Sequence, residues 1–114
     1  MTTYININGD VRDAASLTLP QDRTFRSAWQ FNGAAVEIDM VAARGIHRDN
    51  LRAERGPLLA ALDVDWFRAV EAGGDTAAIA AQKQALRDVT GDARIEAAST
   101  PDALKALTLD ALTA

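Results

Sequence analysis

The stretch "FRSAWQFNGAAVEID", residues 25–39, decides the fold because it carries a strong hairpin signal. Apolar and polar residues alternate before Asn32-Gly33, a dipeptide that favours the positive φ angles of a two-residue type I′ turn. A turn there aligns three pairs on one apolar face: Phe31 with Ala34, Trp29 with Val36, and Ser27 with Ile38. We expect this face to pack on helices; an exposed aromatic docking surface is the alternative.

Two shorter patterns upstream predict further strands. In "YINING", residues 4–9, Ile5 and Ile7 alternate with asparagines before a turn expected at Gly9-Asp10. In "SLTLP", residues 16–20, Leu17 and Leu19 repeat that alternation. Three or four strands suffice for a small antiparallel sheet, and its free edges could accept a strand from a partner.

After residue 38 the apolar residues recur with helical spacing, and Asp39 is a suitable N-cap. Gly56-Pro57 is expected to end or kink this first helix, because proline lacks a backbone N–H. A second helix should then run to Gly73-Gly74, with Leu59, Leu62, Trp66 and Val70 on one apolar stripe, Leu58 and Phe67 beside it, and Trp66-Phe67 expected in the core. A third should run from an Asp75 cap to Gly91. The two form an antiparallel pair with narrow, alanine-rich seams.

The sequence therefore predicts a single α+β domain over residues 1–114. Residues 1–38 form a small N-terminal antiparallel β-sheet with the Asn-Gly hairpin. Residues 39–114 form a helical hairpin followed by a short C-terminal helix, for which Thr100 is the cap and Pro101 the first residue.

Composition excludes several functions. A net charge of −4 argues against nucleic-acid binding, which depends on clustered Lys and Arg. The chain has no cysteine and a single histidine, so we expect no metal site and no cofactor. His47 is expected to be a packed or solvated residue, and no catalytic motif accompanies it, so we do not expect an enzyme. No apolar run approaches the roughly 20 residues that span a bilayer, and we expect no membrane insertion.

Three groups of side chains are the expected contacts with partner proteins. The first belongs to the aromatic hairpin: Phe25, Arg26, Trp29 and Phe31. The second is in an arginine row on the first helix that continues to Arg55 and is a solvated face, a docking face for an acidic protein or, as a third alternative, a contact with nucleic acid: Arg44, Arg48 and Arg52. The third lies in the C-terminal segment, a docking helix or a frayed tail: Leu104 and Leu107.

Four segments of the chain carry a resemblance to a known family: "LPQDRTFRSAW", "VEIDMVAARGIHRDNLR", "PLLAALDVDWFRAVEAGGDTAAIAAQKQALRDVT" and "IEAASTPDALKAL". Together they resemble a family of small proteins from tailed phages, prophages and gene transfer agents, often labelled tail assembly chaperones. The resemblance runs from Leu19 to Leu107. Its most specific pieces are residues 22–26, 62–64 and 83–88. The sequence departs from the family at Ala93, where a proline is usual, and at Ala103, where an acidic residue is usual.

This resemblance implies a role in building a phage-like particle and carries over no catalytic residues. We expect a structural component of the virion or gene transfer agent, an oligomeric adaptor that attaches a receptor-binding fibre or spike to the head or tail. Its partners would be further copies of itself, the fibre or spike protein, and a capsid or tail protein. The alternative is a tail or tail-fibre assembly chaperone that is absent from the mature particle. In either case the chain would be made in the bacterial cytoplasm.

Overall fold

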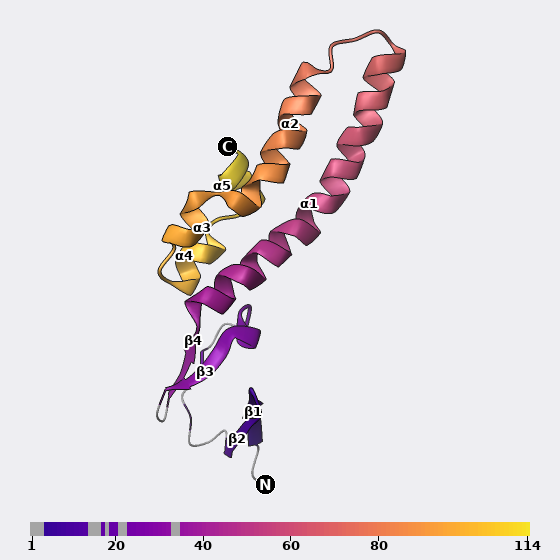
Figure 1. Cartoon of the computed structure of the whole chain (residues 1–114). Helices are drawn as coiled ribbons and strands as arrows, with labels where there is room; N and C mark the ends of the chain where they lie inside the picture. The colour runs from indigo at the N-terminus through magenta and orange to yellow at the C-terminus, as the bar shows by residue number, and fades with distance from the viewer. Residues whose placement is uncertain (1–3, 14–16, 18, 21–22, 33–34) are drawn as a thin grey trace. The chain divides into compact units, whose positions relative to one another are not determined.

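The computed structural model describes residues 4–13, 17, 19–20, 23–32 and 35–114 of the chain. The fold is α+β, as predicted, with short antiparallel strands in the N-terminal part and helices after them (Figure 1). The chain divides into two compact units, residues 1–46 and residues 47–114. The first holds the strands and the start of helix α1, and the second holds the rest of α1 and all later helices.

The first hairpin of the N-terminal unit joins β1 (Tyr4–Ile7) to β2 (Asp10–Asp13). Its turn is Asn8-Gly9, with φ of 55° and 87°, so the predicted turn at Gly9-Asp10 was wrong by one residue. Asn8-Gly9 is the same kind of dipeptide as the Asn32-Gly33 from which the later hairpin was predicted, and it suits a turn because both residue types tolerate positive φ. The Asn6 side chain supports the turn by accepting a hydrogen bond from the Gly9 N–H (2.9 Å).

The prediction of a strand over residues 16–20 was wrong at residues 17, 19 and 20, while residues 16 and 18 lie outside the described part of the chain. Leu17 and Leu19 have no strand conformation, while the partner of β1 is the segment immediately after its turn. A two-residue turn places the next four residues beside β1. Because these residues already pair with β1, the segment around Leu17 and Leu19 is not its partner strand. Leu17 and Leu19 instead lie partly buried against the core of this unit.

The second hairpin joins β3 (Trp29–Asn32) to β4 (Ala35–Ile38) in a separate two-stranded sheet. The observed pairs are Trp29 with Ile38, Gln30 with Glu37, Phe31 with Val36, and Asn32 with Ala35. The predicted register was therefore wrong by two residues, and Asn32 is a paired strand residue. A shift of two keeps every side chain on the same face, so apolar alternation cannot distinguish the two registers. The predicted third pair fails too, because Ser27 belongs to a 3₁₀ turn, η2 (Arg26–Ala28).

The core of the N-terminal unit is small and draws on both hairpins. Ile7, Trp29 and Val36 are its buried members. Partly buried neighbours surround them: Ile5, Leu17, Leu19, Phe31 and Ile38. Because β1 and β3 both contribute to this cluster, the two small sheets stabilise each other through apolar contact.

Helix α1 (Met40–Glu71) is a single helix of 32 residues, so the prediction that one helix ends at Gly56-Pro57 and a second one follows was wrong. Asp39 caps it as predicted, accepting a hydrogen bond from the Val41 N–H (3.0 Å). Proline removes one hydrogen bond from a helix interior. Contacts to α2 on both sides of Pro57 compensate for this loss: Arg55 donates to carbonyls at the end of α2, and Asp63 pairs with Lys83 (2.5 Å).

The end of α1 follows the prediction. Gly73 has φ of +67°. Its N–H donates to the Val70 carbonyl (3.1 Å), and the Gly74 N–H donates to the Ala69 carbonyl (2.8 Å). These two bonds form a Schellman motif, which requires a left-handed residue at the first position after the helix. The motif ends α1 and starts the connection that leads back along it.

The remaining helices complete the C-terminal unit (Figure 1). Helix α2 (Ala77–Asp88) runs antiparallel to α1 and continues into η3 (Val89–Gly91). Three short helices follow: α3 (Ala93–Ala97), α4 (Pro101–Lys105) and α5 (Leu109–Thr113). Thr100 caps α4 as predicted, accepting from the Ala103 N–H (3.1 Å). The buried apolar side chains come from all of these helices: Leu51, Leu86, Val89, Ile95, Leu104 and Leu112.

Candidate interaction surface

The predicted arginine row on α1 divides into residues with different partners. The Arg48 guanidinium donates to the Thr90 carbonyl (3.1 Å) and forms an ion pair with Glu96. The Arg55 Nη1–H donates to the carbonyls of Leu86 (3.3 Å) and Arg87 (2.9 Å), two of the last four carbonyls of α2. Arg48 and Arg55 therefore hold α2 and the segment after it against α1, a role that the sequence pattern did not indicate.

Two other members of the row are placed differently. Arg52 is exposed and pairs with Asp49 three residues away on the same helix (2.7 Å). Arg44 is half-buried and belongs to the N-terminal unit. Of the row, Arg52 is thus the residue whose side chain lies mainly in solvent, and a continuous basic face is not formed.

The predicted aromatic contacts lie mostly inside the N-terminal unit. Phe25 and Trp29 are 2% and 5% exposed, and Phe31 is half-buried with the Arg12 guanidinium 4.2 Å from its ring centroid. Arg26 is exposed. The aromatic face of the hairpin is therefore engaged with the unit's own core, and Arg26 is the member of this group that is accessible to a partner.

The C-terminal segment docks within its own unit. Leu104 is fully buried and Leu107 is half-buried. The Leu107 carbonyl lies 2.8 Å from Nε2 of His47. A carbonyl oxygen only accepts, so Nε2 carries the proton and donates. His47 is thus a buried, packed residue that ties α1 to the segment between α4 and α5.

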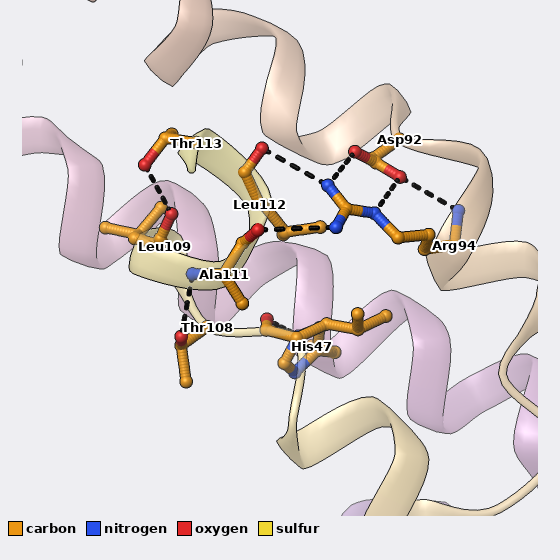
Figure 2. A network of polar contacts seen from close by, with 9 residues as sticks. His47, Asp92, Arg94, Thr108, Leu109, Ala111, Leu112 and Thr113 are labelled. Carbon is orange, nitrogen blue, oxygen red and sulfur yellow. Dashed lines mark hydrogen bonds and ion pairs between the residues drawn. The ribbon is translucent and has the colours of Figure 1, made fainter.

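Arg94 joins the start of α3 to the end of the chain (Figure 2). Its guanidinium binds both carboxylate oxygens of Asp92, at 3.0 and 2.9 Å, and donates to the carbonyls of Ala111 and Leu112 at 3.3 Å. The Arg94 N–H also donates to Asp92, which caps α3 (2.9 Å). The side-chain hydrogen bond, then the backbone one, lowers the pKa of Asp92 to about 2, and the same side-chain bond raises the pKa of Arg94.

Four large apolar side chains of the C-terminal unit are exposed on α1, and three of them form a row: Val64, Phe67 and Val70. They are 49%, 62% and 49% exposed and follow one another at intervals of three residues, while Leu58, further toward the start of the helix, is 48% exposed. The expectation that Phe67 and Val70 belong to the core was wrong. Leu62, Trp66 and Ala69 are half-buried instead, and the Phe67 ring meets that of Trp66 edge-on at 5.5 Å.

The C-terminal unit contains a hollow whose described lining has no ionisable side chain. This hollow of about 400 Å³ is mainly apolar, with lining side chains that include Leu58, Leu62, Leu86 and Thr113. Among the residues that the structure describes, no cluster of three or more His, Asp or Glu side chains is arranged to hold a metal ion. The described helices also include none with the length and hydropathy needed to cross a bilayer.

Comparison of the chain with models of known protein families, with curated proteins and with solved structures found no match.

Proposed function

We propose that this chain is a non-enzymatic structural component of a tailed phage-like particle, an oligomeric adaptor that attaches a receptor-binding fibre or spike to the head or tail. The sequence resemblance described above is the reason for proposing a phage-like particle. The exposed row of Val64, Phe67 and Val70 on α1 is the structural observation that supports an adaptor.

Burying the exposed apolar row against a partner would lower the free energy of the complex. Burying a Val or Phe side chain contributes roughly 1.5–3 kcal/mol, and Phe is among the residues enriched at protein interfaces. Helix α1 is also held by α2, through Arg55 and the Asp63–Lys83 pair. The row is therefore presented on a rigid element, which lowers the entropy lost when a partner binds.

The first experiment is quantitative mass spectrometry of purified mature particles, with the amount of this chain scaled to the major capsid protein. A fixed copy number that matches a symmetric ring supports the adaptor. Absence from particles, together with abundance in the lysate, would overturn it and would identify an assembly chaperone that leaves before maturation.

Two double variants test whether the row is needed for incorporation of the chain into particles. Val64→Ser with Phe67→Ser should reduce incorporation into particles at least tenfold, because it removes the apolar contact area without touching the core. The matched control is Ala77→Ser with Ala81→Ser, two exposed positions on α2. Circular dichroism of both variants checks that helical content is retained. Equal incorporation of the two variants would contradict the assigned role of the row.

A further inference from the structure

A second hollow, in the N-terminal unit, is lined by positive and hydrogen-bonding groups. Its volume is about 470 Å³, within the range of small-ligand sites. The β1 hairpin and the segment from Arg23 to Trp29 form its walls. The polar lining residues are two arginines, two asparagines and a serine: Arg23, Arg26, Asn6, Asn8 and Ser27. Among the residues that the structure describes, no Asp or Glu belongs to this lining.

The backbone brings the two arginines together. The Arg26 N–H donates to the Arg23 carbonyl (3.1 Å) in the turn that precedes η2, so the two residues are neighbours across one turn. Among the described residues, neither guanidinium forms an ion pair, although Arg23 lies over the Trp29 ring at 5.8 Å from its centroid. Two guanidinium groups at one hollow, neither paired with a carboxylate of the described residues, raise the local positive potential in a chain that is acidic overall.

Trp29 contributes its indole ring to the wall of the hollow. The residue is only 5% exposed, and its Nε1 atom is enclosed, with less than 1 Å² of accessible area and no hydrogen-bond partner among the described residues. An anion in the hollow would therefore lie beside the ring, over which the Arg23 guanidinium also lies, and would change the environment of Trp29 without bonding to its N–H.

We propose that this hollow binds an oxyanion, a carboxylate or phosphate group, held by Arg23 and Arg26. Guanidinium groups recognise the paired oxygens of carboxylates and phosphates through two parallel hydrogen bonds. The asparagine amides and the Ser27 hydroxyl supply additional donors at the rim. The source is either a free small anion or an acidic segment of a protein. The assignment does not depend on the proposed role in a particle.

The test uses the indole N–H resonances in a ¹H–¹⁵N spectrum of the full chain. The chain has two tryptophans, Trp29 and Trp66, and the Trp66→Phe variant assigns them. Inorganic phosphate and a tetraglutamate peptide are the two probes, and sodium chloride at equal ionic strength is the blank. The Trp29 resonance should shift and saturate with a probe, while that of Trp66, which lies in the other unit, should stay in place. Saturation with phosphate at lower concentration than with the peptide assigns a free anion, and the reverse order assigns an acidic segment.

Three variants test the arginines. Arg23→Gln and Arg26→Gln should each weaken binding at least about tenfold, because each removes a charge-assisted hydrogen bond. Arg68→Gln removes one charge from an exposed position of α1 and should leave binding unchanged. The proposal is overturned if the wild-type Trp29 resonance fails to saturate with both probes, or if sodium chloride moves it equally. It is also overturned if Arg68→Gln weakens binding as much as the other two variants.

Discussion

His47 and Leu107 are joined across 60 residues of sequence by a hydrogen bond of 2.8 Å between the imidazole Nε2 and the backbone carbonyl. The imidazole is buried, so this bond fixes the tautomer of the only histidine and holds the segment between α4 and α5 against α1. It gives the histidine a structural role.

Replacing His47 with Ala should lower the free energy of unfolding by about 1–2 kcal/mol, because the Leu107 carbonyl loses its donor. Chemical denaturation followed by circular dichroism measures the change. His47→Gln is the matched variant, since its amide can still donate a hydrogen bond, and it should recover part of the loss. If Ala and Gln destabilise the chain equally, the hydrogen bond is not the source of the effect.

Arg55 and Arg52 lie three residues apart on α1 and should differ sharply in their effect on stability. Arg55→Ala removes two hydrogen bonds to the end of α2 and should cost about 1.5–3 kcal/mol of unfolding free energy. Arg52→Ala removes an exposed pair with Asp49 and should cost less than about 1 kcal/mol. Thermal unfolding of the two variants under the same conditions compares them directly, and equal melting temperatures would contradict this difference in role.

Asp92 should make stability depend on acidic pH. Its pKa in the folded chain is about 2, against 3.8 for the unperturbed group. A lowered folded pKa means that the ionised carboxylate stabilises the fold above its unfolded pKa, and that this contribution disappears as the pH falls through the folded pKa. Asp92→Asn should therefore melt below the wild type above about pH 5, with a difference that narrows as the pH falls toward 2.

Melting temperatures of both proteins across this pH range provide the measurement. Arg94→Gln serves as a second variant, because it removes the guanidinium that lowers the pKa of Asp92. It should weaken the same pH dependence while keeping the carboxylate. A wild-type minus Asp92→Asn difference that stays constant from pH 5 to pH 2 would refute the assignment.

Gly56 and Gly73 provide a test of backbone conformation in which space is not a factor, since a Cβ at either position meets no atom within 4 Å. Gly56 lies inside α1, so Gly56→Ala should raise the unfolding free energy by about 0.5–1 kcal/mol. Gly73 has φ of +67°, so Gly73→Ala should lower it by roughly 1–2 kcal/mol. Denaturant titration of both variants gives the two signs, and a gain at both positions would show that the Schellman motif is not strained by alanine.

Short-range signals predicted the helix ends well. Asp39, Gly73 and Thr100 act where the sequence placed them, because each capping bond spans only a few residues and depends on the local side chain. The hairpin around residues 29–38 was also predicted, although its register was not. Apolar alternation has a period of two, and it is satisfied equally by registers that differ by two.

The candidate surface was harder to predict than the fold. The four-residue spacing from Leu62 through Trp66 to Val70 predicted one buried stripe. Val70 is instead exposed, as are Val64 and Phe67, because packing within the unit decides which side of α1 is covered. Arg48 was assigned to a solvated or docking face, yet it bonds to residues more than 40 positions later in the chain. The partners of a long, flexible guanidinium depend on which backbone carbonyls the folded chain brings within reach, and sequence spacing does not contain that information.

The sequence by itself determined the α+β order of elements, the caps that start and end the main helices, and the acidic charge. These properties depend on residue type and on neighbours within one or two turns. Only the tertiary structure decided that α1 continues through Pro57, that Trp29 and Leu104 are buried within their own units, and that Phe67 is exposed. Those outcomes depend on contacts between distant segments, whose free energies outweigh local preferences of about 1–3 kcal/mol per residue.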